Sequence, residues 1–175
     1  KYHGYGTSKY PDGSKYEGQW KNGEKNGKGK LFSPNGDIYV GEFKDGYFHG
    51  KGECKYIDGT KYDGEFIFGE YNGEGIHTYM DGSKYDGEFK NGQPNGKGNF
   101  SKPDGTKYSG EFKDGKFCGN GENTFPDGTI YNGQFNNGQP EGEGILIFPS
   151  GGKLVEEFKE LKPWNVKEFD NKGNL

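Results

Sequence analysis

The residues of this chain best suited to acid–base or metal chemistry are its three histidines, His3, His49 and His77. His3 and His49 each precede a Gly-x-Gly motif, at a position that asparagine fills elsewhere, in Asn26, Asn72 and Asn95. Because asparagine is equivalent there, both are interpreted as hydrogen-bonding turn residues rather than as bases or ligands. No carboxylate, cysteine or second histidine is placed by motif to join His77. We therefore predict no catalytic residue, no metal site, no cofactor and no enzymatic activity.

The glycine pairs are a second candidate for chemistry, since glycine-rich loops can bind phosphate groups. Such loops follow a strand and open a helix, and none of the pairs here has that context. No Gly-Lys-Ser or Gly-Lys-Thr sequence occurs either. The glycine pairs are therefore interpreted as structural.

The two cysteines, Cys54 and Cys118, are too few to form a disulfide framework in a chain of 175 residues. They are predicted to be free thiols, which favours a reducing, cytoplasmic location. The sequence has no apolar run of membrane-spanning length and no signal-peptide pattern. Because the chain begins at Lys1 and its only methionine is Met80, we expect it to be part of a longer one.

Charge restricts the partners that the chain can bind. All 23 basic residues are lysines, and the 27 acidic residues give a net charge of −4. Arginine recognises phosphate and guanine through two parallel hydrogen bonds, and this chain has none. A nucleic-acid partner is therefore not expected, and binding to acidic membrane lipids is disfavoured as well.

Two columns of opposite charge recur along the sequence. One consists of glutamates, and the other lies two residues further along and consists of lysines. The columns are Glu42, Glu65, Glu88 and Glu111, and Lys21, Lys44, Lys90 and Lys113. We interpret them as a solvated face whose stripes compensate each other, each exposed pair contributing about 0–1 kcal/mol. The alternative is an electrostatic docking surface for an acidic membrane or partner.

The elements that must position these residues follow from an internal repeat of 23 residues. Each repeat contains a tyrosine, a glycine two residues later, a Phe or Trp after two more, a further glycine, a Gly-x-Gly pair and a turn glycine. Six full repeats begin at Tyr16, Tyr39, Tyr62, Tyr85, Tyr108 and Tyr131. Residues 1–15 contain in-frame glycines and are interpreted as a half-repeat.

The spacing within the repeat predicts strands rather than helices. Tyr, Gly and Phe at alternate positions lie on one face of an extended strand. Asn-Gly and Asp-Gly pairs bracket the strands and supply the positive φ of tight turns. Aromatic rings are expected to lie against the glycine backbone of the neighbouring strand, in place of an aliphatic core. By the same alternation, Gly50 and Gly52 are predicted to share a face with Cys54 and Tyr56.

The pattern Tyr-x-Gly-x-Phe-x-x-Gly, then Gly-x-Gly, then Asp-Gly resembles the MORN (membrane occupation and recognition nexus) repeat over residues 1–153. The resemblance implies an all-β fold, an elongated, twisted antiparallel meander of hairpin repeats with a groove lined by aromatics. It also implies scaffolding roles. Families with such repeats include cytoskeletal and ciliary proteins, junctional membrane tethers, and enzymes that carry the array as an appendage.

Residues 154–175 depart from the repeat pattern. Leu154, Phe158 and Pro163 keep its frame, whereas other residues replace the glycines. We expect a degenerate capping repeat. A short helix over residues 154–161 is the alternative, because Leu154, Phe158 and Leu161 also fit helical spacing.

The expected function is that of a non-catalytic scaffold in the cytoplasm, in a cytoskeletal or ciliary assembly, that binds other proteins or a second copy of itself. The alternative is a regulatory or membrane-targeting, phosphoinositide-associated appendage of a larger enzyme such as a lipid kinase. The predicted partner-binding residues are the aromatic columns of the central repeats and a hot spot in the third repeat. The columns are Tyr39, Phe43, Tyr62, Phe66, Tyr85, Phe89, Tyr108 and Phe112, and the hot spot is Ile67, Phe68 and Tyr71. Other repeats place Lys-Asn or Lys-Asp where the third has Ile67 and Phe68, and this apolar pair either packs on a neighbouring repeat or forms a contact site.

Overall fold

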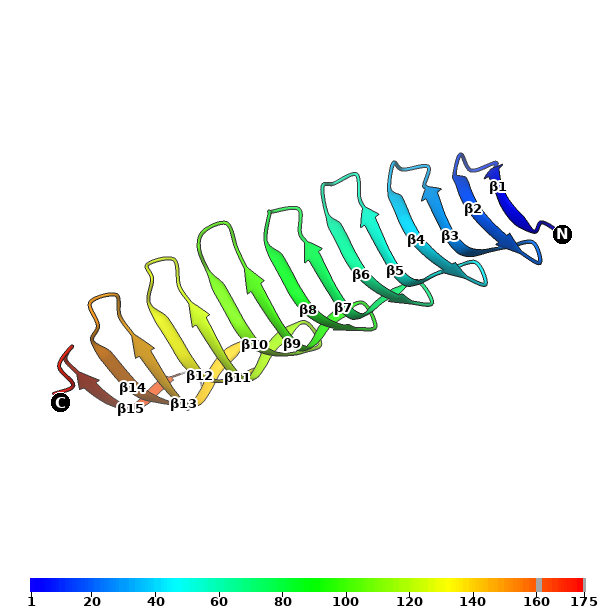
Figure 1. Cartoon of the computed structure of the whole chain (residues 1–175). Coiled ribbons are helices and arrows are strands. Elements are labelled where there is room, and N and C mark those ends of the chain that lie inside the picture. Colours follow the sequence, from blue (N-terminus) through cyan, green and yellow to red (C-terminus); the bar gives the residue numbers. More distant parts are fainter. Residues whose placement is uncertain (160–161, 175) are drawn as a thin grey trace. The chain divides into compact units, whose positions relative to one another are not determined.

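The computed structural model describes residues 1–159 and 162–174, and over these residues the chain forms fifteen strands and no helix (Figure 1). The strands are antiparallel and follow one another in sequence order within one sheet, which confirms the predicted all-β meander. Their bounds are β1 Gly4–Lys9, β2 Lys15–Lys21, β3 Glu24–Phe32, β4 Ile38–Lys44, β5 Tyr47–Lys55, β6 Lys61–Ile67, β7 Glu70–Thr78, β8 Lys84–Lys90, β9 Gln93–Ser101, β10 Lys107–Lys113, β11 Lys116–Thr124, β12 Ile130–Asn136, β13 Gln139–Ile147, β14 Lys153–Lys159 and β15 Lys162–Phe169.

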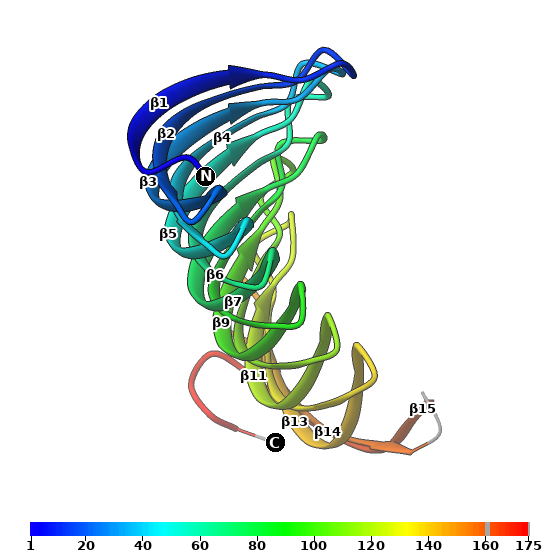
Figure 2. The ribbon, with the colours of Figure 1, turned by 90° about the vertical axis from the view of Figure 1, so that its right-hand side faces the viewer.

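The chain divides into two compact units. The N-terminal unit comprises residues 1–82 and 88–93, and the C-terminal unit comprises residues 83–87 and 94–175. Both consist of the same hairpin repeat, with arched strands (Figure 2).

Two-residue turns close each repeat hairpin. In the third repeat, Phe68 and Gly69 form this turn, and both have positive φ, as a type I′ turn requires. The N–H of Gly69 donates a hydrogen bond of 2.9 Å to the carbonyl of Phe48, which lies one repeat earlier. The same bond recurs at the other five turn glycines, at Gly23, Gly46, Gly92, Gly115 and Gly138. Each of these turns is therefore linked to the preceding hairpin by a backbone bond as well as by the strand ladder.

The repeat hairpins contain an irregularity that the alternation of residues did not predict. It is found in β2–β3, β4–β5, β6–β7, β10–β11, β12–β13 and β14–β15. In the second repeat the register shifts between Gly41 and Glu42, and Gly50 has a φ of 60°. A Cβ added at Gly52 would meet the ring of Tyr39, but one added at Gly50 would meet the side chain of Glu42. The prediction that Gly50 and Gly52 present the same face is therefore wrong, because the bulge reverses the direction in which Gly50 points.

The C-terminal region continues the sheet. β14 pairs with β13 on one side and with β15 on the other, again with a register shift in the hairpin. Residues 153–159 are thus a strand, and the helical alternative is not found over them. Leu161, the last residue of the proposed helix, lies outside the described residues.

Candidate protein-binding surface

A column of buried tyrosines forms the centre of the sheet's packed face, which we call the ring face. Each column member is at most 2% exposed. The members are Tyr16, Tyr39, Tyr62, Tyr85, Tyr108 and Tyr131. The Tyr62 hydroxyl donates a hydrogen bond of 2.9 Å to the carbonyl of Glu65, and its ring lies over the Gly64–Gly75 pair of β6 and β7. Paired glycines leave room for the ring, and the buried hydroxyl still finds a partner.

A second column of rings connects each repeat to the one before it. Phe66 packs edge-on against Tyr62 of its own repeat at 5.1 Å and against Tyr39 of the preceding repeat at 5.2 Å between ring centroids. A third ring lies flat on the tyrosine, as Tyr71 does on Tyr62 at 3.6 Å and 7°. Edge-on and stacked rings at these distances are favourable beyond their buried area. The ring face therefore takes the place of an aliphatic core.

The structure buries the eight predicted column residues. Tyr39, Phe43, Tyr62, Phe66, Tyr85, Phe89, Tyr108 and Phe112 are between 0% and 4% exposed. In this structure they hold neighbouring strands together and have almost no side-chain surface to present to a partner. Direct partner contact by these columns stays a prediction.

The predicted hot spot of the third repeat is placed differently. Ile67 is 45% exposed and Phe68 is 62% exposed, at the tip of the β6–β7 hairpin. Tyr47, which is 57% exposed, lies beside them, with its ring centroid 6.2 Å from that of Phe68. Tyr71 is half-buried in the ring stack. We call Tyr47, Ile67 and Phe68 the tip patch. The sequence comparison of repeats singled out Ile67 and Phe68 but missed Tyr47.

The backbone of Phe68 is in a conformation that suits its side chain poorly. Its φ is 49°, in the left-handed region, where the other five turns have Asn or Asp. The left-handed conformation costs an L-residue about 1–2 kcal/mol, and Asn and Asp tolerate it best. Since most of the Phe68 side chain is in solvent, burial does not offset this cost. The backbone at Phe68 is therefore strained, and the contacts of its ring with Tyr47 and His49, at 6.2 Å and 6.0 Å between centroids, leave most of the side chain exposed.

The histidines do not form a chemical site in the described residues. His49 lies in β5 beside the bulge, not in the turn, and its buried Nδ1 has no hydrogen-bond partner there, which corrects the turn-residue interpretation for His49. Burial lowers the pKa of His77, which packs edge-on against Tyr79. Within the described part of the chain, no three His, Cys, Asp or Glu side chains are grouped to hold a metal ion.

The two thiols differ in environment, which gives a testable order of reaction. Cys54 is 4% exposed, and burial raises its pKa to about 11, whereas Cys118 is only half-buried. Because the thiolate is the reactive form, about one thousandth of Cys54 is reactive at pH 8. We expect a thiol reagent to modify Cys118 first, at least about tenfold faster than Cys54, and to find two thiols in denaturant. Equal rates in the folded protein, or no thiol in denatured monomer, would contradict this assignment.

Solved structures with a similar fold include two peptide-bound domains. One is the TCP domain of SAS-4 from Drosophila melanogaster in complex with a proline-rich motif of Ana2, with a TM-score of 0.54 and 14% identity over 97% of this chain and 86% of that chain. The other is the TCP10 domain of CPAP from Danio rerio in complex with a STIL peptide, with a TM-score of 0.35 and 19% identity over 95% and 88% of the two chains. At 14% identity, the likeness to the domain from Drosophila melanogaster concerns the fold alone.

Helices long and apolar enough to cross a membrane are absent from the described residues. The model of the MORN repeat matches the chain seven times, over residues 1–15, 16–38, 39–61, 62–84, 85–107, 108–130 and 131–153. These matches cover most of the sequence, and the hairpin, turn and ring pattern described above recurs with the same period. The chain therefore belongs to the MORN repeat family.

Proposed function

We propose that this chain is a non-catalytic scaffold that binds a segment of a partner protein through the tip patch. The ring columns build a rigid sheet and hold the β6–β7 hairpin tip in place. The patch then presents two aromatic rings and a branched aliphatic side chain, which are the kinds of residue that carry binding energy in protein interfaces.

The observation that carries the proposal is the conformation and exposure of Phe68. Its φ of 49° disfavours phenylalanine, and 62% of the side chain is exposed. The same turn in the other repeats is made by Asn-Gly or Asp-Gly, so the fold does not need an aromatic residue there. A strained, exposed aromatic residue is expected where a partner covers it.

The structural neighbour from Drosophila melanogaster supports binding of a peptide segment, because a sheet of similar fold was solved with a proline-rich motif. We propose for this chain a role in a cytoskeletal or ciliary assembly, as the repeat family leads us to expect. The tip patch lies at the end of the β6–β7 hairpin.

The test combines Ile67→Lys with Phe68→Asn, which restores the Lys-Asn turn of other repeats. Peptides selected from a displayed library on the wild-type chain should bind this variant at least about tenfold more weakly, because loss of a hot-spot side chain costs about 2 kcal/mol or more. The melting temperature should hold or rise, since asparagine relieves about 1 kcal/mol of backbone strain.

The matched control is Lys113→Gln with Asp114→Asn in the turn between β10 and β11, where both side chains are exposed. This control should leave both binding and the melting temperature unchanged. If the selected peptides bind the Ile67→Lys, Phe68→Asn variant as well as they bind the wild type, the tip patch is not the binding surface. A large loss of stability would show that Ile67 and Phe68 serve the fold.

A further inference from the structure

On the face of the sheet opposite the rings, positive and negative side chains do not balance everywhere. On this face, which we call the charged face, strands β1–β5 carry eight lysines and four glutamates, although the whole chain has a net charge of −4. The lysines are Lys9, Lys15, Lys21, Lys28, Lys30, Lys44, Lys51 and Lys55, and the glutamates are Glu17, Glu24, Glu42 and Glu53. The interpretation of mutually compensating stripes therefore does not hold over these strands.

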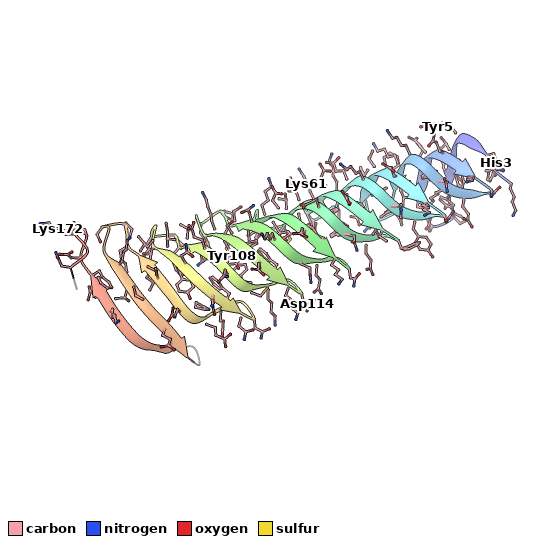
Figure 3. All side chains as sticks on the ribbon, turned by 60° about the horizontal axis from the view of Figure 1, so that its bottom comes forward. His3, Tyr5, Lys61, Tyr108, Asp114 and Lys172 are labelled. Carbon is pink, nitrogen blue, oxygen red and sulfur yellow. The ribbon has the colours of Figure 1, made fainter. Side chains whose placement is uncertain are left out.

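A hollow of about 500 Å³ lies within this basic region. Its walls include Lys28, Lys30 and Lys51, and its apolar lining includes Tyr5 and Val40, which are 77% and 45% exposed. Tyr5 is labelled on the N-terminal strands in Figure 3. Two strand glycines, Gly29 and Gly41, also line the hollow. All of these residues belong to the N-terminal unit.

The lysine ammonium groups that line the hollow form no ion pair among the described residues. Lys15 pairs with Glu17, and Lys55 pairs with Glu53 at 3.0 Å, so the carboxylates of these two pairs are already engaged. Lys28 and Lys51, by contrast, form no ion pair among the described residues. Lys30 lies over the ring of Phe32 at 4.7 Å. In the strand register, Lys30 lies directly opposite the exposed Val40, and Lys28 lies opposite Glu42.

We infer that this hollow binds an acidic peptide segment that carries one apolar side chain. Carboxylates of the peptide would pair with Lys28 and Lys51, while its apolar side chain would cover Val40. Charge complementarity favours such a segment, since opposite potentials meet in protein interfaces. Glu17 and Glu42 in the same wall repel any anion, so the affinity has to come from the three lysines. The absence of arginine disfavours phosphate, because arginine holds phosphate with two hydrogen bonds. This site is independent of the tip patch.

The test measures fluorescence anisotropy of a labelled nonapeptide of aspartate and glutamate with one central leucine, added to the full chain at low salt. We expect binding that weakens as salt rises, because exposed charges are screened beyond about 10 Å at 0.1 M. Changing Lys28, Lys30 and Lys51 together to glutamine should weaken binding at least about tenfold. Replacing the peptide's leucine by alanine, or Val40→Ser in the protein, should each weaken it about threefold.

The control changes three exposed lysines of the C-terminal unit, Lys107, Lys113 and Lys116, to glutamine, which removes the same charge. It should change binding by less than about twofold, and both triple variants should melt like the wild type. Equal losses in the two triple variants, or no binding of the peptide at low salt, would overturn the inference. Tighter binding of oligothymidylate or phosphatidylserine vesicles through the same lysines would overturn it too, since the surface would then select phosphate. The Ile67→Lys, Phe68→Asn variant should bind the nonapeptide normally, so failure of either proposal is distinguishable from failure of the other.

Discussion

Replacing Gly75 by alanine is expected to destabilise the fold by about 3 kcal/mol, because the new methyl group would overlap the Tyr62 ring. An added Cβ would lie 2.5 Å from the Tyr62 hydroxyl oxygen and 2.7 Å from Cζ. The ring cannot move aside, since Tyr71 stacks on it at 3.6 Å and Phe66 packs against its edge. Urea denaturation of the variant and the wild type measures the loss.

Gly6→Ala is the matched control for this prediction. Gly6 has the same place in the half-repeat that Gly75 has in the third repeat, but a tryptophan ring, not a tyrosine ring, lies nearest to it. The nearest atoms to an added Cβ are those of the Trp20 ring, at 3.6 Å and 3.7 Å, which is ordinary contact. This variant should lose less than about 1 kcal/mol. A similar loss in both variants would show that alanine is disfavoured there for a reason other than the ring.

Most of this fold could be predicted because its determinants are local and repeated. Asn-Gly and Asp-Gly pairs specify the turns, and alternation of Tyr, Gly and Phe specifies the strand and its packed face. The sequence also predicted that the rings lie against glycines, because a ring needs a neighbouring position without a side chain. Tyr62 and Gly75 show this arrangement, and it recurs through the repeats.

The bulge could not be predicted from alternation alone. Strict alternation along a strand assigns Gly50 and Gly52 to one face, but this alternation holds only where the strand contains no extra residue. The positive φ of Gly50 accommodates the register shift, and a glycine can adopt it without cost to a side chain. Nothing in the spacing distinguishes a glycine at a bulge from a glycine beneath a ring.

The candidate sites depend on residues that differ between repeats and on the pairing of strands, and the shared repeat pattern describes neither. Ile67 and Phe68 could be found because they break the pattern, but the exposure of Phe68 needs the hairpin tip in three dimensions. The basic hollow joins residues from different strands, such as Lys28 and Lys51, through the strand register. Column by column, lysines and glutamates are balanced in the sequence, and the surplus of lysines is found only when strands β1–β5 are taken together.

Phe66→Ala is expected to cause the largest loss of stability, about 3–5 kcal/mol. Phe66 is 1% exposed, and its ring contacts the edges or faces of four others, two from the preceding repeat and two from its own. The four partners are Tyr39, Phe48, Tyr62 and Tyr71. Because each repeat is stabilised mainly by its neighbours, removing this ring weakens the second repeat as well as the third. Amide hydrogen exchange should therefore accelerate in β4 and β5 as well as in β6 and β7.

Phe68→Ala is the matched control, since it removes the same side chain two residues further along the chain. Phe68 is 62% exposed and its ring contributes little to packing, while alanine at a φ of 49° is no worse placed than phenylalanine. The control should change the free energy of unfolding by less than about 0.5 kcal/mol and leave hydrogen exchange in β4 and β5 unaltered. If Phe66→Ala accelerated exchange only in β6 and β7, the rings would stabilise single hairpins. The coupling between neighbouring repeats would then have to come from the backbone, through the strand ladder and turn bonds such as that of Gly69 to Phe48.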